Sequence, residues 1–369
     1  MLIRFVGNWR PRARTTTPQR RQRRLGVLAV AVALAALMAS CGGSSTTGDR
    51  AEAAEGAVAE QVTIPTPFPS GVTLRVGDQL DYFKNILALS GQDQGLPYTI
   101  EYANFLGGPA MLQAFQAGEI DLGFVANTPL IFAQAANQDI VAIAGWVNGR
   151  SPLSLVTAPG VDDIHGWADL EGRSVAMQHG TVLQAAVLSG LDGVGLAYDA
   201  VDAVDLPTTQ VSQALEGRSA DAGILPEPLS TAYLQKNPTA RKVADAAELT
   251  DRTQFVIATE DVFANAGRTA AAADFVARLV KAFQWINANP EAWAQELYVD
   301  QYGISLEKGV ELLTDGGGSR FVELPGELVE PTQRLADLYV DAGEIPKPLD
   351  VTAQFDPRFN TIVKEASSR

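Results

Sequence analysis

The chain has 369 residues, a formal net charge of −15 and a single cysteine, Cys41. Eight arginines and no acid lie within the first 24 residues, so the chain beyond this leader carries −23. A chain so acidic is a poor candidate for binding nucleic acid, which requires a basic surface. A single cysteine excludes an internal disulfide, and no cysteine past residue 41 is present to act as a thiol nucleophile. The chain has only two histidines, which argues against a zinc site. We therefore expect neither a metal nor a cofactor.

The amino-terminal segment has the order of a secretory signal. The basic stretch is followed by an uncharged run, residues 25–38, and then by Ala39, Ser40 and Cys41. This run is too short to span a hydrocarbon core of roughly 30 Å as a permanent helix. Residues 38–41 resemble the lipobox of bacterial lipoproteins, with Met38 in place of the usual leucine. We therefore predict a signal peptide at 1–40 and a lipid on Cys41; the alternative is a stray cysteine in a signal peptide.

Residues 41–71 are predicted to be a flexible linker, because they are rich in Gly, Ser, Thr and Ala and then punctuated by prolines. Ordered structure is predicted to begin at Val72. Alternation and β-branched residues predict strands at 72–77, 98–102, 121–125, 140–146, 153–157, 174–178, 203–206, 220–225 and 254–258. Helical spacing predicts helices at 109–117, 129–136, 182–191, 210–216, 269–288, 290–299, 305–313 and 326–342, and a helical turn at 165–170.

Strands and helices that alternate in this way are typical of βαβ units, and about 300 ordered residues suffice for two α/β lobes. A weak internal echo supports two related halves. Residues 117–123 and 216–223 both read as a helix end, a glycine C-cap and a short strand.

Three turns share one local design: a strand end, a glycine or small polar residue, and a helix start. They are Gly107-Gly108-Pro109, Asn127-Thr128-Pro129 and His179-Gly180-Thr181. Helix N-termini carry free N–H groups and partial positive charge, and therefore bind anions without lysine or arginine. In an open α/β sheet such turns lie at the carboxyl ends of strands, where ligands bind. For any one of these turns alone, ordinary helix capping is the more frequent explanation.

Several segments in this order resemble the substrate-binding proteins of ABC importers for aliphatic sulfonates, taurine and nitrate. The match runs from about residue 72 to 300. The segments that carry it are 104–115 (NFLGGPAMLQAF), 117–123 (AGEIDLG), 128–135 (TPLIFAQA), 153–157, 167–176 (WADLEGRSVA), 226–228 (PEP) and 286–290 (INANP).

The resemblance implies an α/β fold of the periplasmic-binding-protein type II, with two lobes, two crossover segments and a ligand cleft between them. Lobe one would comprise 72–148 plus 253–369, and lobe two 149–252. The resemblance also implies that the protein acts on the extracytoplasmic or periplasmic face of the cell membrane. Its partners there would be a small-molecule ligand, an ABC permease and the ATPase of that permease. The receptor is expected to be a monomer, held at the membrane by its lipid and not bound to nucleic acid.

By position, the resemblance assigns one side of an oxyanion site to Gly107, Gly108, Pro109, Asn127 and Thr128. Gly180 and Thr181 would approach from lobe two, next to His179, and Glu227 would lie at the cleft edge. In the first loop, 77–83, Gln79 is the candidate ligand contact.

That loop is more acidic than is usual in sulfonate binders. Asp78 and Asp81 would repel a bare anion, or favour a ligand that also carries a cationic tail, such as taurine. Solvation at the surface is the alternative for both. Trp146, at a strand end close to the first crossover, is a candidate for lining an apolar pocket; core packing is its alternative.

Three classes of function remain. The first is a receptor without catalysis, most directly for an aliphatic sulfonate or taurine, with nitrate, bicarbonate and pyrimidine or riboflavin-like ligands as alternatives. The second is a hydrolase on the same scaffold, but related sulfur-releasing enzymes use a cleft cysteine, which this chain lacks. The third is a sensory lipoprotein. We predict a receptor and not an enzyme.

Overall fold

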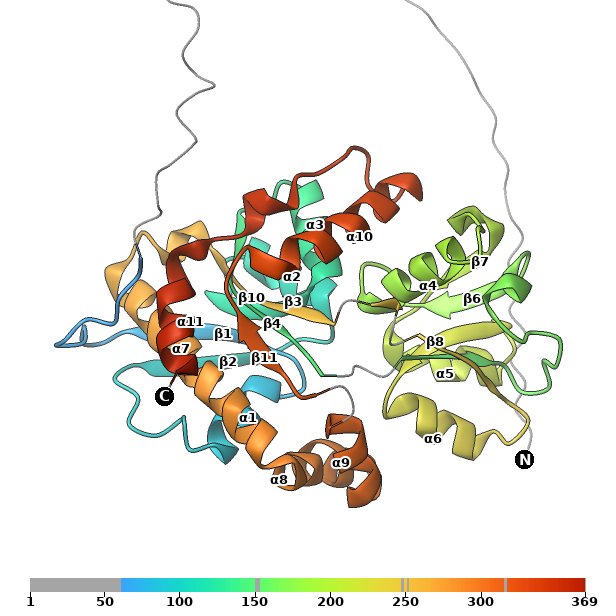
Figure 1. The fold of residues 1–369 in the computed structure, drawn as a ribbon, viewed down its shortest axis with the longest axis horizontal. Coiled ribbons are helices and arrows are strands. Elements are labelled where there is room, and N and C mark those ends of the chain that lie inside the picture. Colours follow the sequence, from blue (N-terminus) through green and yellow to red (C-terminus); the bar gives the residue numbers. More distant parts are fainter. Residues whose placement is uncertain (1–60, 150–152, 247–248, 251, 315–316, 369) are drawn as a thin grey trace, which may run out of the picture. The chain divides into compact units, whose positions relative to one another are not determined.

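The computed structural model describes residues 61–149, 153–246, 249–250, 252–314 and 317–368 (Figure 1). The predicted signal peptide and the predicted lipidation site Cys41 lie outside these residues. Within the described ranges, no helix combines the length and the apolar character needed to cross a bilayer.

The end of the predicted linker is packed and not free. The side chain of Gln61 donates to the carbonyl of Pro357 at 3.3 Å, and Phe68 stacks on Tyr98 with 5.5 Å between ring centroids. The prediction that order begins at Val72 was therefore too late. Proline punctuation indicates irregular backbone, but it does not reveal that an aromatic side chain within that segment has a partner.

One sheet has six strands in the order β11-β4-β10-β3-β1-β2. Strand β1 pairs in parallel with β2 and β3, while β10 runs antiparallel between β3 and β4. Strands β1 to β4 therefore all end at the same edge. The strands are Thr73–Asp78 (β1), Thr99–Asn104 (β2), Leu122–Ala126 (β3), Ile140–Val147 (β4), Thr253–Thr259 (β10) and Arg320–Val322 (β11).

Helices cover both faces of this sheet (Figure 1). One face packs against α1, α7 and α11 through a core that includes Phe83 and Phe275, and the other against α2, α3 and α10 through Met111 and Leu335. The helices are Tyr82–Leu89 (α1), Gly108–Gln116 (α2), Asn127–Ala135 (α3), Ala266–Ala288 (α7), Pro290–Ala294 (α8), Leu306–Thr314 (α9), Val329–Asp341 (α10) and Asn360–Ser367 (α11), with a π-helical turn at Gln295–Asp300.

The second sheet has five strands in the order β7-β6-β8-β5-β9, with separate cores on its two faces. Its strands are Leu153–Thr157 (β5), Ser174–Met177 (β6), Asp202–Asp205 (β7), Ala222–Pro226 (β8) and Lys242–Asp245 (β9), and its helices Val182–Asp192 (α4), Thr208–Glu216 (α5) and Leu229–Lys236 (α6). Ala185 and Leu188 of α4 belong to the core that contains α3 and α10, so α4 also packs against the first lobe.

Short 3₁₀ turns complete the fold at Trp167–Leu170, Tyr198–Ala200, Glu260–Val262, Gly326–Leu328, Val351–Gln354 and Pro357–Phe359. All nine predicted strands and the predicted helices correspond to observed elements, so the α/β prediction is confirmed. Among the described α-helices and β-strands, five were not predicted: α1, α6, α11, β9 and β11.

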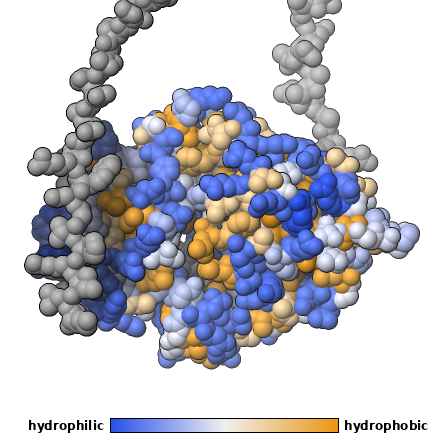
Figure 2. All heavy atoms as spheres, turned by 180° about the vertical axis from the view of Figure 1, so that it is seen from behind, coloured by the Kyte–Doolittle hydropathy of each residue, from blue (hydrophilic) through white to orange (hydrophobic). Residues whose placement is uncertain are grey.

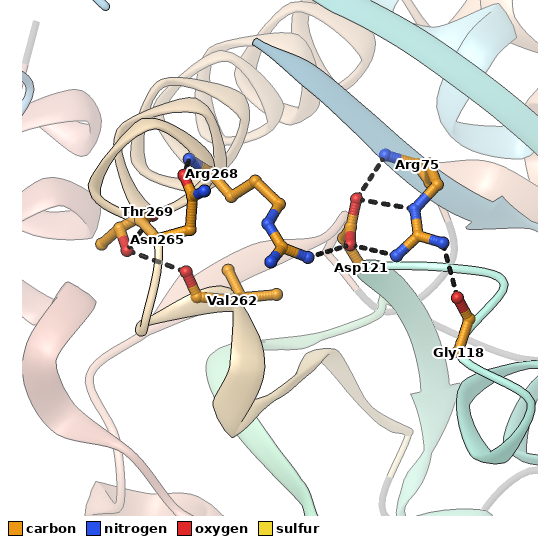
Figure 3. A network of polar contacts seen from close by, with 7 residues as sticks. All are labelled: Arg75, Gly118, Asp121, Val262, Asn265, Arg268 and Thr269. Atoms are coloured by element: carbon orange, nitrogen blue, oxygen red, sulfur yellow. Dashed lines mark hydrogen bonds and ion pairs between the residues drawn. The ribbon is translucent and has the colours of Figure 1, made fainter.

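A buried carboxylate joins three parts of the first lobe at the amino end of β3 (Figure 3). Asp121, which is 2% exposed, accepts hydrogen bonds from the backbone N–H of Arg75 at 2.9 Å and from its guanidinium at 2.6 and 3.1 Å. Arg268 of α7 donates to the same carboxylate at 3.0 Å. The two arginines thus tie β1 and α7 to the turn before β3.

Most large hydrophobic side chains are buried. Seen from behind, the surface is largely hydrophilic, with hydrophobic residues in patches between (Figure 2). Among described residues, the most exposed large hydrophobic side chains are Leu106 at 65% and Leu80 at 53%, both in loops that follow strands of the first sheet.

Candidate ligand-binding site

Helices α1, α2 and α3 follow β1, β2 and β3 and begin at the edge where these strands end. In the second lobe, α4 follows β6 in the same way. Four helices therefore begin directly after the carboxyl ends of strands, where the sequence predicts ligand contacts. They differ in what already satisfies their N–H groups, and this difference decides which of them are open to an anion.

The N-terminus of α1 is occupied by a side chain of the protein. Asp78 is fully buried, and its carboxylate accepts hydrogen bonds from the backbone N–H groups of Gln79 (2.8 Å), Phe83 (3.0 Å) and Lys84 (3.0 Å). Burial raises the pKa of this carboxyl group, although the three hydrogen bonds oppose that effect. The alternative interpretation of Asp78, that it is a solvated surface residue, is therefore wrong. The carboxylate fills the place that an anionic ligand would take at α1.

The other residues of this loop are also engaged. Asp81 exchanges two hydrogen bonds with Asn104, at 2.7 and 2.9 Å, which join the loop after β1 to the end of β2. The side-chain amide of Gln79, a predicted ligand contact, donates to the Phe124 carbonyl at 2.9 Å. Gln79 thus fixes the loop to β3 in this structure.

Helix α2 has no side chain that caps its N-terminus, whereas at the start of α3 the side chain of Asn127 accepts the N–H of Thr128. Gly107 precedes α2 with φ of 86°, a left-handed conformation that favours glycine. A β-carbon on Gly108 would lie 2.1 Å from Cγ of Pro129, so only glycine allows this close approach. The contact brings the starts of α2 and α3 side by side.

The side chains of Asn127 and Thr128 are buried. The Asn127 carbonyl oxygen accepts from the N–H of Thr128 at 2.8 Å, and the hydroxyl of Tyr339 on α10 lies 3.4 Å from that of Thr128. Asn127 lines a different cavity, of about 300 Å³, which is bordered by α4 and α10.

The start of α4 comes close to the start of α2. A β-carbon on Gly107 would lie 3.5 Å from the amide nitrogen of Gln178, and one on Gly180 would lie 3.6 Å from Cγ of Pro109. The structure therefore brings the predicted residues Gly107, Gly108, Pro109 and Gly180 together.

The N-terminus of α4 is satisfied by its own residues. The Thr181 hydroxyl accepts from the N–H of Leu183 at 3.2 Å, and the N–H of Gly180 donates to the side chain of Gln184 at 2.8 Å. His179 pairs with Glu344, which follows α10 in the first lobe, and its ring packs edge-on against Phe132. His179 thus contacts the first lobe directly.

Trp146 packs in the core of the first lobe. It is 1% exposed, and aromatic rings of Phe83, Phe124, Phe283 and Phe321 lie within about 6 Å of it. Its indole N–H donates to Asn148 at 2.9 Å. Trp146 lies on β4, between β10 and β11 in the middle of the sheet. These contacts agree with core packing, which was the alternative to the predicted pocket-lining role.

A cavity of about 350 Å³ opens between segments of both sheets. Glu227, the residue predicted for the cleft edge, lines it after β8, and Asn148 and Gly149 line it after β4. The remaining wall comes from α1, from α7 to α9, and from residues 317–319. Its volume lies within the range of small-molecule sites, roughly 300–1,000 Å³.

Most of the aromatic wall of this cavity was not predicted from the sequence. Tyr82 begins α1, Trp293 lies in α8, and Tyr298 lies in the π-helical turn that follows. Single π-helical turns are rare and often mark functional sites. No local pattern in the sequence distinguished these rings from core residues, since their convergence depends on tertiary packing.

The comparisons with known proteins agree with this architecture. A family model described as NMT1/THI5 like matches residues 92–293. A protein of Escherichia coli named as an aliphatic sulfonates-binding protein is 25% identical over 284 residues, which cover 75% of this chain and 86% of the relative. A protein of Brachyspira hyodysenteriae named as an ABC transporter periplasmic binding protein is 24% identical over 283 residues, 73% of this chain and 75% of the relative.

Among solved structures, the alkanesulfonate-binding protein SsuA from Xanthomonas axonopodis pv. citri, bound to MOPS, has a TM-score of 0.68 with this chain. The identity is 22%, and the match covers 78% of this chain and 99% of SsuA. The relatives are binding proteins and not enzymes. Because the family model covers more than half of the chain, the protein belongs to the NMT1/THI5-like family, and it is a solute-binding protein with the periplasmic binding protein fold.

Proposed function

We propose that the protein is a lipid-anchored receptor on the extracytoplasmic face of the membrane that captures a small organic anion, an aliphatic sulfonate or taurine, and delivers it to an ABC importer. Residues 72–148 plus 253–369 and residues 149–252 are the proposed lobes, and a lipid on Cys41 is the proposed anchor. A monomer would suffice, because each receptor docks separately on the permease.

One observation carries the proposed ligand class: the starts of α2 and α3 lie side by side, and α2 has no side-chain cap. Helix N-termini attract anions through free N–H groups and the helix dipole. The starts of α1 and α4, by contrast, are occupied by Asp78 and Thr181. Relatives named for sulfonates, one of them bound to MOPS, support the same class of ligand.

Thermal unfolding of the protein without its signal peptide tests the ligand class. Ethanesulfonate and taurine at 100 times their Kd are expected to stabilise the protein by about 2.7 kcal/mol. Nitrate, bicarbonate, a pyrimidine and riboflavin serve as comparison ligands. If one of these raises the Tm and no sulfonate does, the proposed ligand class is wrong.

A pair of matched glycine variants tests the location. Gly107→Ala and Gly118→Ala both place a β-carbon on a residue with positive φ, but only Gly107 lies at the start of α2. Gly107→Ala is expected to weaken sulfonate binding about tenfold, or about 1.4 kcal/mol, while Gly118→Ala keeps the affinity of the unmodified protein. Equal affinity in both variants would remove the start of α2 from the site.

The anchor is tested separately, in cells. Cys41→Ala is expected to move the protein from the membrane fraction to the soluble fraction, because a lipid attached to Cys41 would hold it at the membrane. Ser45→Ala, a few residues further on, serves as the control. If the Cys41→Ala protein stays in the membrane fraction as fully as the control, the lipid is not its anchor.

A further inference from the structure

The 350 Å³ cavity has an unusual balance of groups. Among its described lining residues, Glu227 is the one side chain that is charged at neutral pH, and no described lysine or arginine lines the wall. The rest is aromatic, aliphatic or neutral polar, including Tyr82, Trp293 and Tyr298. An organic anion has no electrostatic partner on such a wall, whereas an organic cation has one.

Glu227 is held in place but is not neutralised by the groups that hold it. One carboxylate oxygen accepts from the Ser230 hydroxyl and the other from the N–H of Thr231 at 3.3 Å, both at the start of α6. No ion pair joins Glu227 to a described cation within 4.0 Å. A carboxylate accepts about four hydrogen bonds, so acceptor capacity remains.

The charge of Glu227 acts on the opposite wall. Burial raises the pKa of the Tyr298 phenol to about 12, and the negative charge of Glu227 adds to that increase. Tyr298 belongs to the first lobe and Glu227 follows β8 in the second. The carboxylate and the tyrosine therefore face a common space that both lobes enclose.

The aromatic rings of the wall are fixed. Tyr82 and Trp293 pack edge to face, with ring centroids 5.4 Å apart and an angle of 75° between the rings, and Trp293 is 2% exposed. Tyr82 also packs against Phe124 and Phe283 of the core. Rigid tryptophan and tyrosine rings attract cations by about 0.5–2 kcal/mol, more when the cation is desolvated.

We propose that this cavity binds the positively charged nitrogen of the solute, with Glu227 as its counter-ion and Tyr82, Trp293 and Tyr298 as its aromatic wall. The inference rests on the proposed receptor function and narrows its ligand class. The preferred solutes are then organic acids that also carry an ammonium group, and purely anionic sulfonates are weaker ligands.

The test compares two sulfonates that differ at one end. Taurine carries an ammonium group where isethionate carries a hydroxyl group. By calorimetry at pH 7, the unmodified protein is expected to bind taurine at least about tenfold more tightly than isethionate. Glu227→Gln keeps the shape of the side chain and removes its charge, so it is expected to erase this preference. Glu171→Gln, an exposed acid elsewhere in the second lobe, is the control and is expected to retain it.

The outcomes separate the two proposals. Equal binding of taurine and isethionate, unchanged in Glu227→Gln, would overturn the cation site and leave a sulfonate receptor. If neither sulfonate binds, the proposed function fails, and choline, a cation without an acid group, then tests the cavity alone. Choline binding that is lost in Glu227→Gln would support the cation site, and choline binding that is absent or insensitive to the variant would overturn it.

Discussion

Asp121 and Asp221 make the same backbone contact in two different sheets. Asp121 accepts the N–H of Arg75 at 2.9 Å, and Asp221 accepts the N–H of Ser174 at 3.0 Å. The backbone N–H groups of the two aspartates donate back to the carbonyls of the same partners, at 2.8 and 2.9 Å. Each aspartate thus fixes the neighbouring parallel strand, β1 in the first sheet and β6 in the second, at the amino end of its own strand.

The equivalence extends to strand order. Strands β2-β1-β3-β10-β4 of the first sheet correspond to β7-β6-β8-β5-β9 of the second, with the fourth strand antiparallel to the third in both. The two lobes are therefore versions of one βαβ-based design. The internal echo in the sequence, 117–123 and 216–223, marks the same turn in each.

Removing the carboxylate of Asp121 is expected to destabilise the protein. Asp121→Asn leaves the charges of Arg75 and Arg268 without their counter-ion, and we expect a loss of about 2–4 kcal/mol in the free energy of unfolding at pH 7. This loss is smaller than the cost of breaking a fully buried ion pair, because both arginine side chains are about one-third exposed and solvent screens their charges. Urea unfolding measures it.

The same loss should depend on pH. Burial tends to raise the pKa of Asp121, but hydrogen bonds from Arg75 and Arg268 outweigh burial and lower it below its ordinary value. The stabilisation by Asp121 is therefore complete above about pH 4, the ordinary range of the group, and is lost as the pH falls toward the folded-state pKa. Asp221→Asn, whose partner Ser174 is uncharged, is the control and should cost less. An equal cost in both variants would contradict the role of the arginines.

The turns before Asp121 and Asp221 are similar in sequence but differ in backbone conformation. Gly118 adopts a φ of 68° after α2, as a glycine C-cap predicts. In the second lobe, Gly217 has a φ of −80° and the left-handed residue is Arg218, with a φ of 55°. Arg218 donates to the Pro159 carbonyl at 3.0 and 2.8 Å, a contact that helps to hold this conformation.

Gly118→Ala is expected to lower the free energy of unfolding by about 1 kcal/mol, because a β-carbon disfavours the left-handed conformation. The substitution meets no neighbour within 4 Å, so the cost is one of backbone conformation alone. Gly166→Ala is the matched control, since Gly166 is extended, with a φ of −176°, and is also free of neighbours. If the two variants unfold at the same urea concentration, backbone strain at Gly118 is not the cause.

Periodicity and turn residues predicted most of the fold, and the failures have physical reasons. Helix α1 was missed because no residue next to its start caps it; its cap is Asp78, at the end of β1. Glycine and proline at residues 107–109 predicted the start of α2. The cavity wall was not predictable, because Tyr82 and Trp293 are more than 200 residues apart in the chain and meet only through packing.

Gly108→Ala is expected to reduce both stability and sulfonate affinity. The new β-carbon would overlap Pro129, at 2.1 and 2.6 Å from its ring carbons, so α2 and α3 must separate. Overpacking of this kind costs about 1–3 kcal/mol. Measured at a temperature where the variant remains folded, sulfonate affinity should fall more than in Gly118→Ala. Loss of stability with unchanged affinity would show that the spacing of α2 and α3 does not matter for binding.

Asp78→Asn is expected to weaken α1 without affecting sulfonate binding at α2 and α3. The neutral amide has one acceptor oxygen where the carboxylate has two, so the N–H of Lys84 or of Phe83 loses its partner, at a cost of about 1 kcal/mol at pH 7.

The pH dependence at Asp78 should be opposite to that at Asp121. Burial raises the pKa of Asp78 in the folded protein. The folded state therefore binds the proton more readily than the unfolded state, and this group favours folding more as the pH falls through its raised pKa. The stability of the unmodified protein relative to Asp78→Asn should thus rise on acidification, as urea unfolding at a series of pH values would measure. A relative stability that falls on acidification would mean that the three hydrogen bonds, and not burial, dominate the charge state of Asp78.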